Sequence, residues 1–474
     1  MSMITPVADT IAAIATPLGR GGVGIIRVSG TAAGAIAAAM VGRELVPRVA
    51  TAATFLGARG EPLDQGLAVF FSAPRSYTGE PVLELQGHGG PVVLRLLLAR
   101  CLELGARLAT PGEFTQRAFL NGKLDLAQAE SVADLIDAAT ATAARAAARS
   151  LSGVFSQQIH ALVDALIELR MFAEATLDFP DEDLDFLRAG DAQGKLTAIR
   201  ARLAQILALA IQGALLRDGL AVVLIGQPNV GKSSLLNQLA GDDIAIVTAI
   251  PGTTRDTVSS QIEIHGIPLT IIDTAGLRAT HDPIETLGIE RTWAAVKRAD
   301  LALVIVDARE ADDTAGAPAA ANRAILAALP ATLPRIIVHN KIDLASAGPN
   351  DQPRTEIREE RFANEASAVP RPHSWLSAKT GAGVDALRRT ILAATGAQEN
   401  MEGAFLARER HLIALREADV RLAAAAQLLG VASPPLELFA EELRGAQTAL
   451  ATITGEFSAD DLLGAIFSRF CIGK

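Results

Sequence analysis

One segment of the sequence restricts the fold of the chain more than any other. The apolar run Leu220–Ile225 leads into the loop Gly226-Gln-Pro-Asn-Val-Gly-Lys-Ser233, and the helix-forming residues Ser234–Leu239 follow it. A strand, a glycine-rich loop and a helix in this order turn backbone N–H groups towards a phosphate at the helix N-terminus. In such a loop Lys232 neutralises phosphate charge and the hydroxyl of Ser233 coordinates Mg²⁺. The segment therefore predicts an α/β domain that binds a nucleotide.

Further motifs along the chain predict which nucleotide is bound. In Asp273-Thr-Ala-Gly276 the carboxylate reaches Mg²⁺ and the glycine N–H reaches the γ-phosphate. In Asn340-Lys-Ile-Asp343 the carboxylate accepts N1–H and the 2-amino group of guanine, a pair that adenine lacks. Ser377-Ala-Lys379 adds a backbone contact to guanine O6, and Thr253 and Thr254 lie where a mobile threonine completes the Mg²⁺ shell. Five motifs in this order predict a GTP-hydrolysing enzyme.

The residues that would catalyse hydrolysis are less ordinary. Leu277 follows the Asp273–Gly276 motif, where many signalling GTPases have a glutamine that orients the attacking water. Because leucine cannot orient water, another residue must do so, and Glu285 is the best nearby carboxylate. It could equally be a charge on a helix surface. Asn229 can ligate a monovalent cation between the phosphates, where an arginine finger would act, or it can merely cap the loop.

The pattern of apolar residues divides the 474-residue chain into segments. Residues 1–122 predict an α+β domain with helices around 31–41 and 91–103. Residues 123–218 have the spacing of long helices, and residues 219–396 alternate strands with helices, as a parallel sheet requires. The helical pattern returns over 397–474, so one helical domain would carry the α/β domain as an insertion. The expected strands are Val23–Val28, Thr54–Ala58, Leu67–Phe71 and Val82–Leu85, then Leu220–Ile225, Leu269–Ile272, Leu301–Val306 and Arg335–Val338.

Composition excludes several classes of protein. The formal net charge of −10 argues against binding dominated by a phosphate backbone, so an RNA partner would require a local basic patch or a helper protein. Two distant cysteines, Cys101 and Cys471, form no disulfide framework and fit a reducing compartment. No run approaches the roughly 20 apolar residues of a membrane span, and the N-terminus resembles neither a signal peptide nor a transit peptide. We therefore expect a cytoplasmic protein that is not bound to a membrane.

Glycines cluster in two N-terminal stretches, Arg20–Arg27 and Tyr77–Gly90. An isolated glycine is by default a tight turn, but this cluster surrounds Arg27, Glu84 and His88 and indicates close approach of the backbone to a ligand. At the other end, Ser458 can cap an amphipathic helix that ends on Cys-Ile-Gly-Lys474. This tail superficially matches a prenylation box, but its terminal lysine and the lack of an upstream basic cluster argue against lipidation.

The whole chain resembles the bacterial tRNA-modification GTPase family called MnmE or TrmE. The resemblance rests on these runs beside the nucleotide motifs: Asp9-Thr-Ile, Thr16-Pro-Leu-Gly-Arg-Gly-Gly-Val-Gly, Ser76-Tyr-Thr-Gly-Glu, Pro111-Gly-Glu-Phe-Thr-Gln-Arg-Ala-Phe-Leu-Asn-Gly-Lys-Leu-Asp-Leu-Ala-Gln-Ala-Glu130, Asp178-Phe-Pro-Asp-Glu and the terminal Cys-Ile-Gly-Lys. It implies a multidomain fold. Residues 1–122 would form an α+β domain that binds tetrahydrofolate and dimerises. Residues 123–218 and 397–474 would form the two parts of an all-α helical domain. Residues 219–396 would form an inserted Ras-like G domain.

The resemblance also implies partners and chemistry. The family acts as a homodimer in a heterotetramer with a flavin-dependent MnmG (GidA)-type protein, and it installs an aminomethyl-type group at C5 of the wobble uridine of certain tRNAs. The one-carbon unit comes from a tetrahydrofolate derivative (5,10-methylene-, with 5-formyl- as an analogue), while FAD and NADH belong to the partner. K⁺ and Mg²⁺ serve hydrolysis. In the family a K⁺ ion, with G domains pairing across the dimer, replaces the arginine finger, which would explain Leu277 and Asn229 together.

Carried over residue by residue, the resemblance assigns roles to single positions. Folate contacts fall on Arg27, Glu84, Lys123 and Lys474, and the catalytic glutamate falls on Glu285. Mg²⁺ ligands fall on Ser233 and Thr254, and K⁺ ligands on Asn229, Thr248, Ile250 and Thr253. The remaining GTP-binding residues are Val230, Gly231, Lys232, Ser234, Ala249, Pro251, Gly252, Asp273, Thr274, Ala275, Gly276, Asn340, Lys341, Ile342, Asp343, Ser377, Ala378 and Lys379. Cys471 is placed for thiol chemistry near the folate, or it is simply a packed residue at a helix end.

Two other classes of function compete with a tRNA-modifying enzyme. A GTPase switch in ribosome assembly or RNA chaperoning should carry a basic C-terminal RNA-binding module, which this chain lacks in sequence. A regulatory switch with an exchange factor and an activating protein would hydrolyse GTP slowly in every salt, because of Leu277. Dependence of hydrolysis on K⁺ separates these alternatives.

Overall fold

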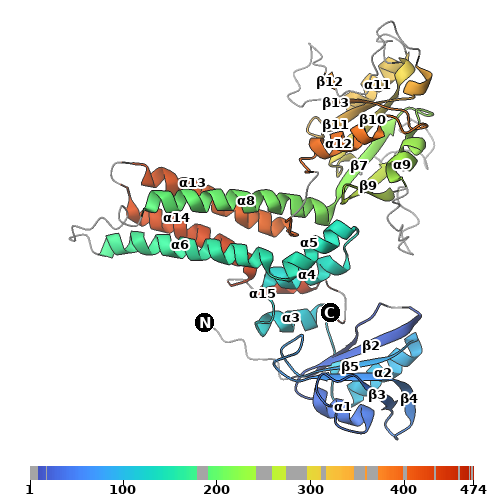
Figure 1. The fold of residues 1–474 in the computed structure, drawn as a ribbon, viewed down its shortest axis with the longest axis vertical. Coiled ribbons are helices and arrows are strands. Elements are labelled where there is room, and N and C mark those ends of the chain that lie inside the picture. The colour runs from blue at the N-terminus through green and yellow to red at the C-terminus, as the bar shows by residue number, and fades with distance from the viewer. Residues whose placement is uncertain are drawn as a thin grey trace. The chain divides into compact units, whose positions relative to one another are not determined.

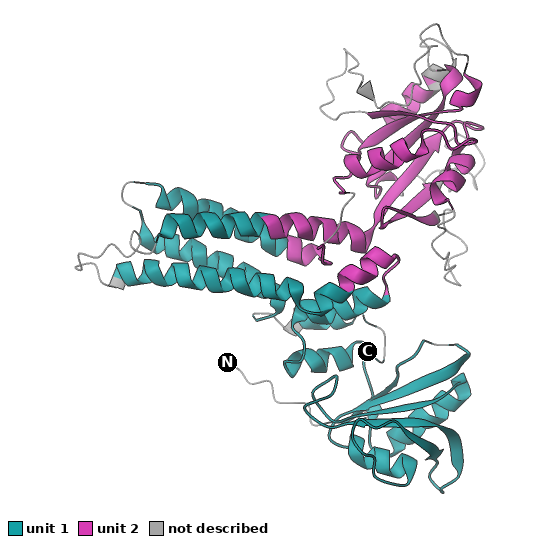
Figure 2. Ribbon diagram, viewed as in Figure 1, with its two compact units in different colours: residues 1–136, 148–204, 413–474 teal, residues 137–147, 205–412 magenta. Residues whose placement is uncertain are grey.

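The structure is a computed structural model. It describes residues 9–17, 19–178, 191–241, 259–273, 296–310, 317–345, 358–359, 372–398, 403–431, 434–456, 460–468, 470 and 473. The chain forms two compact units (Figure 2). The first contains residues 1–136, 148–204 and 413–474, and the second contains residues 137–147 and 205–412. The domain boundaries expected at 122, 218 and 396 stay predictions.

The first unit contains a sheet that is mainly antiparallel (Figure 1). Among the described residues its strand order is β3-β4-β5-β2-β1-β6, and the short edge strand β6 runs parallel to β1. The strands are β1 (Ile11–Ile14), β2 (Gly21–Ser29), β3 (Thr51–Leu56), β4 (Pro62–Phe71), β5 (Val82–Gly89) and β6 (Arg107–Leu108). Register pairs Arg27 on β2 with Glu84 on β5, which brings two sequence-predicted residues side by side.

Helices α1 (Ala33–Val41) and α2 (Pro91–Glu103) pack against this sheet. Alternate residues of β2 and β5, among them Ile26, Val28, Leu83 and Leu85, are fully buried against apolar residues of both helices. This alternation leaves Arg27 and Glu84 to point to the opposite face. The two-residue period of the strands thus separates the core from the face that carries the predicted ligand contacts.

The rest of the first unit is helical. Leu126 and Ala129 of α4 pack against Leu463, Ile466 and Phe467 of the C-terminal helix α15. The bounds are α3 (Glu113–Leu120), α4 (Leu126–Ile136), α6 (Val154–Asp178), α14 (Leu436–Thr454) and α15 (Asp460–Phe467), with α5 (Ala141–Leu151), α8 (Ala192–Asp218) and α13 (Glu409–Leu429) having residues in both units. Residues 179–182 of the run Asp178-Phe-Pro-Asp-Glu lie outside the described part.

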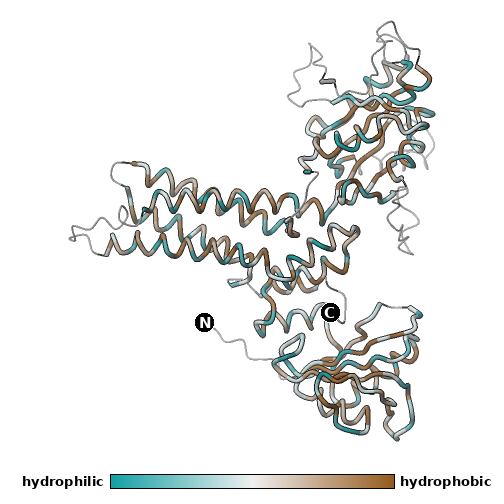
Figure 3. The backbone as a smooth tube through the Cα atoms, in the orientation of Figure 1, coloured by the Kyte–Doolittle hydropathy of each residue, from teal (hydrophilic) through white to brown (hydrophobic). Residues whose placement is uncertain are grey.

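The second unit contains a sheet of order β12-β13-β11-β10-β7-β9-β8 among the described residues. Its five central strands are parallel and its two edge strands antiparallel. The strands are β7 (Leu220–Gly226), β8 (Ser259–Ile264), β9 (Ile267–Asp273), β10 (Leu301–Asp307), β11 (Arg335–Asn340), β12 (Arg358–Glu359) and β13 (Pro372–Trp375). The central strands β7 and β10 are apolar along almost their whole length, as strands buried on both faces must be (Figure 3).

The helices of the second unit alternate with these strands, as the sequence predicts. Within the described ranges, the helices that accompany the sheet are α9 (Lys232–Ala240), α11 (Ala317–Ala328) and α12 (Val384–Ala394), with short 3₁₀ turns η1 (Ala308–Glu310) and η2 (Ile342–Leu344). The carboxyl ends of the parallel strands meet at one edge, because register aligns Gly226 with Ile305 and Asp307 with Asn340. Ligands bind at this edge in open parallel sheets.

One described helix, α8, is long and apolar enough to cross a membrane by length and composition alone. Its 18-residue apolar window has a mean hydropathy of 1.4, and 39% of that window is buried inside the protein. Leu203, Ala210 and Leu216 are among its buried residues. The window thus also fits a core helix.

All eight expected strands are present, but several others are not predictable from short apolar runs. Strand β13 is only four residues long and mostly polar, and it is completed by pairing with β11, which is distant in sequence. The edge strand β8 begins with three polar residues and is completed by a tight hairpin with β9, so pairing decides what the apolar pattern does not.

Candidate guanine-nucleotide site and N-terminal pocket

The phosphate-binding loop has the geometry that its glycines predict. Strand β7 is buried up to Ile225, the loop turns at Asn229 with φ of 62°, and Gly231 has φ of 96° directly before α9. Only glycine adopts the last conformation without strain. Lys232 Nζ donates hydrogen bonds to the carbonyl oxygens of Gly226 and Gln227, at 2.8 and 3.1 Å, and so lies folded over the loop.

Asn340 joins the loop to the segment that binds the base. Its Nδ2 donates to the carbonyl of Val230 at 2.8 Å, and its Oδ1 accepts from the backbone N–H of Ala378 at 2.9 Å. The side chain is buried, so both bonds are made away from water, where a lost partner is costly. Gly231 lies so close to this amide that a Cβ there would overlap Asn340 Nδ2. Three motifs therefore meet at one side chain, with Val230 and Ala378 lying 110 and 38 residues from Asn340 in sequence.

Asp343 is held by the adjacent motif. Ser377 Oγ donates to Asp343 Oδ1 at 2.6 Å and accepts from the N–H of Thr380 at 3.2 Å. The hydroxyl fixes one oxygen of the carboxylate and orients the group, as a positioning hydrogen bond does. A carboxylate held in this way can accept the two N–H groups on the guanine edge. The structure thus orients Asp343, and its selection of guanine stays a prediction.

Sequence reasoning missed Asp307 at the end of β10. Its buried carboxylate accepts from Lys341 Nζ at 2.9 Å and from Arg309 Nη2 at 2.7 Å. The hydrogen bond from Arg309, with that from Lys341, holds the pKa of Asp307 well below its usual range in spite of burial. Lys341 itself has φ of 70°. The only signal in the sequence was a carboxylate at the carboxyl end of a buried strand, a position where sites form in such sheets.

We expect Asp307→Asn to weaken GDP binding about fivefold. Asparagine keeps the shape of the side chain but removes the charge that holds Lys341, and a partly buried charged hydrogen bond contributes roughly 1 kcal/mol. Fluorescence titration with a labelled guanine nucleotide measures the change. Asp385→Asn, at an exposed ion pair on α12, is the matched control. An unchanged affinity in Asp307→Asn would show that Asp307 does not position the motif.

Several predicted residues fall outside the part of the chain that the structure describes. Of Asp273 only the backbone is described, as the last residue of β9. Ser233 and Ser234 begin α9, and Lys379 follows Ala378 in the base-binding segment. The residues outside are Thr248, Ala249, Ile250, Pro251, Gly252, Thr253, Thr254, Thr274, Ala275, Gly276, Leu277, Glu285, Cys471 and Lys474.

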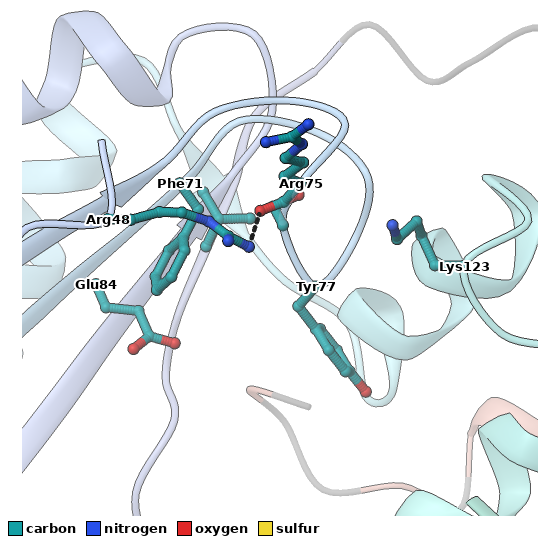
Figure 4. A pocket seen from close by; sticks show the side chains of 8 residues that line it. Arg48, Phe71, Arg75, Tyr77, Glu84 and Lys123 are labelled. Carbon is teal, nitrogen blue, oxygen red and sulfur yellow. Dashed lines mark hydrogen bonds between the residues drawn. The ribbon is translucent and has the colours of Figure 1, made fainter. Parts of the chain in front are cut away.

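A second site lies in the first unit, around the pair predicted from the N-terminal glycines. Arg27 Nε and Nη2 approach Glu84 Oε1 at 3.0 and 2.9 Å, and the Arg27 guanidinium lies 5.4 Å from the centre of the Tyr77 ring. Burial raises the pKa of Tyr77, whose hydroxyl is 2.8 Å from Thr115 Oγ1. Glu84, Tyr77 and Lys123 line one cavity of about 340 Å³ (Figure 4). His88 does not join them, because it lies farther along β5 and pairs with Asp64.

A buried ion network fixes the loop that carries Tyr77. Arg117 donates to Glu80 Oε2 at 3.1 Å, to Asp9 Oδ1 at 2.7 Å and to Glu113 Oε1 at 2.9 Å. Burial raises the pKa of Glu113, but hydrogen bonds from Arg107, Thr110 and Arg117 outweigh it and lower the pKa to about 2. Glu113 is therefore ionised at neutral pH and keeps the network intact. The cavity wall is thus held by charges from three separate segments.

Comparison with known proteins identifies two family domains in the chain. The model of the family described as GTP-binding protein TrmE N-terminus matches residues 10–123, and that of the MnmE helical domain matches residues 126–471. Among solved structures, an Era variant from Aquifex aeolicus bound to GDP and AlF4− is 24% identical and covers 42% of this chain and 66% of its own, with a TM-score of 0.27.

Relatives of high identity span nearly the whole chain. A protein of Laribacter hongkongensis named tRNA modification GTPase MnmE is 60% identical over 98% of this chain and 99% of its own length. Proteins of the same name from Ralstonia nicotianae and Thiobacillus denitrificans are each 58% identical, over 98% and 99% of this chain and 96% and 99% of their own lengths. The chain therefore belongs to the MnmE (TrmE) family of tRNA modification GTPases.

Proposed function

We propose that the chain is a K⁺-stimulated GTP hydrolase that acts with a flavin-dependent MnmG (GidA)-type partner on tRNA. The product is a carboxymethylaminomethyl or aminomethyl group at C5 of the wobble uridine of certain tRNAs. The observation that carries the hydrolase part is the Asn340 bridge between the phosphate loop and Ala378, with Asp343 oriented by Ser377. Relatives named tRNA modification GTPases supply the tRNA part.

The phosphate side of the site supports hydrolysis assisted by cations. Ser233, at the start of α9, and Thr254 would hold Mg²⁺, while Asn229, Thr248, Ile250 and Thr253 would hold K⁺ between the phosphates. Asn229, the member of the K⁺ set that belongs to the described phosphate loop, turns that loop with φ of 62°. Glu285 would position the attacking water. The K⁺ would supply the positive charge that an arginine finger gives elsewhere.

The N-terminal pocket supports a folate. A tetrahydrofolate derivative would supply the one-carbon unit, and a cavity of about 340 Å³ lies at the lower end of the range for small ligands. The Glu84 carboxylate can accept N–H groups of a pterin ring, and the ion pair with Arg27 orients that carboxylate. Gly473 lies against the Ile14 carbonyl of β1, beside the Ala13–Arg27 register pair. Lys474 and Cys471 flank Gly473 in sequence, which supports their assignment near the folate.

The proposed assembly is a cytoplasmic homodimer that joins the MnmG-type protein in a heterotetramer. Bound FAD and NADH would belong to that partner. The net charge of −10 supports an assembly in which the partner makes much of the contact with tRNA.

Nucleoside analysis of tRNA from a deletion strain tests this function. Complementation with the full chain should restore the modified wobble uridine, and Arg27→Ala should not restore it. If the full chain hydrolyses GTP in the complemented strain but its tRNA still lacks the modified nucleoside, the proposal is refuted.

Arg27→Ala should lower the affinity of the full chain for 5-formyltetrahydrofolate at least tenfold. Glu84 would lose the guanidinium that orients it, and the carboxylate would keep no charged partner in a mostly buried position. Isothermal titration calorimetry measures the affinity, and a thermal melt confirms that the variant is folded. Arg59→Ala, at an exposed turn of the same sheet, is the matched control. Undiminished binding by Arg27→Ala would rule out this assignment.

A further inference from the structure

The cavity beside Glu84 carries more positive charge than a pterin requires. Arg48, Arg75 and Lys123 all line it, and they come from three segments that are distant in sequence (Figure 4). The one carboxylate that lines it, Glu84, is already paired with Arg27. Within the described part of the chain, no carboxylate lies at ion-pair distance from Arg48, Arg75 or Lys123. Three cations thus face the cavity without a protein counter-charge there.

The protein holds two of these cations by backbone atoms. Arg48 Nη2 donates to the carbonyl of Arg75 at 3.1 Å, and Lys123 Nζ donates to the carbonyl of Pro74 at 3.2 Å. The backbone N–H of Arg48 donates to Phe70 O at 2.7 Å. Arg48 has φ of 63°, a backbone conformation that residues other than glycine rarely adopt. Each bond uses one donor of a group that has three or five, so further donors are free to bind an anion.

We propose that Arg48, Arg75 and Lys123 form a subsite for the glutamate tail of the folate, so that the chain binds polyglutamylated folates in preference to the monoglutamate. This inference rests on the proposed folate site. Each γ-linked glutamate adds one carboxylate to the tail, and two glutamates give three carboxylates for three cations. Carboxylates accept charge-assisted hydrogen bonds from arginine and lysine side chains such as these three.

The geometry favours a small-molecule tail over RNA phosphate. The three cations line the same cavity as Glu84, Tyr77 and the apolar Phe71 and Val82. Contacts to a nucleic-acid backbone would instead follow an extended basic surface. A pterin held at Glu84 would leave its tail to extend towards the cations, since Glu84 and Lys123 lie on either side of Tyr77 (Figure 4).

Calorimetric titration of the full chain with 5-formyltetrahydrofolate carrying one or three glutamates tests the subsite. At about 50 mM salt the triglutamate should bind about five- to tenfold more tightly, since exposed charge pairs each contribute a factor of roughly two or three. The preference should shrink at about 300 mM salt through screening. In the double variant Arg48→Gln with Arg75→Gln it should fall below about twofold. Arg95→Gln on α2 removes an exposed arginine outside the cavity and should keep it.

Each other outcome overturns the proposal in a distinct way. Equal affinity for both forms, with the monoglutamate bound normally, removes the tail subsite but leaves the folate site. If neither form binds the wild-type chain, the proposed folate function fails and the subsite with it. If the double variant keeps its tail preference but loses affinity for tRNA in filter binding, the cations serve RNA instead.

Discussion

Asp343→Asn is expected to lower the affinity for GTP about 100-fold and to raise that for xanthosine triphosphate. The Asp343 carboxylate is oriented by Ser377 and accepts two N–H groups of guanine, and charged hydrogen bonds contribute roughly 1.5–3 kcal/mol each. An asparagine amide still accepts from N1–H, but its N–H₂ meets the 2-amino group of guanine. Xanthine has an oxygen at that position, which an amide can bind and a carboxylate repels.

Competition titrations with the two nucleotides measure this exchange of specificity. Asp385→Asn, the same chemical change at an exposed residue of α12, should leave both affinities unchanged. Equal loss of affinity for GTP and for xanthosine triphosphate would indicate that the substitution disturbs the fold, and a thermal melt identifies that case. Retention of normal GTP affinity by a folded Asp343→Asn protein would contradict the assignment of the base-binding residue.

The second large effect is expected from the monovalent cation. Hydrolysis of GTP should be at least about tenfold faster in KCl than in NaCl at equal ionic strength, because positive charge between the phosphates stabilises the transition state as an arginine finger does. The predicted ligand Asn229 lies at the turn of the phosphate loop, with a left-handed backbone. Phosphate release under saturating GTP measures the rate.

Asn229→Ala separates binding of the cation from binding of the nucleotide. The variant should lose most of the stimulation by K⁺ while its affinity for GDP changes little. Asn322→Ala is the matched control. It removes an asparagine amide of the same unit, one that accepts a hydrogen bond from Gln227. Equal rates in the two salts with the wild-type chain would remove the cation mechanism and favour a regulatory switch.

Local sequence specified most of the nucleotide-binding sheet. Apolar runs predict β7 and β10, because a strand buried on both faces is apolar along nearly all of its length, and shorter apolar runs predict β9 and β11. Gly226 and Gly231 fix the turn between β7 and α9, since their conformations or surroundings exclude a side chain. The predicted guanine specificity of Asp343 also rests on the chemistry of its side chain alone. These features depend on residues close together in the chain.

The tertiary structure decided what connects these parts. Whether Asn340 reaches Val230 depends on the parallel register that brings the ends of β7, β10 and β11 to one edge, and no local pattern states that register. The same register places Asp307 beside Lys341.

In the first unit, the sequence indicated Arg27 and Glu84 through their glycines, but the pairing of β2 with β5 made them an ion pair. Packing of loops from three distant segments gathered Arg48, Arg75 and Lys123 around one cavity. Residue types and local spacing thus determined which chemistry the chain can perform. Long-range backbone pairing, whose partners lie tens to hundreds of residues apart, decided which of these groups act together.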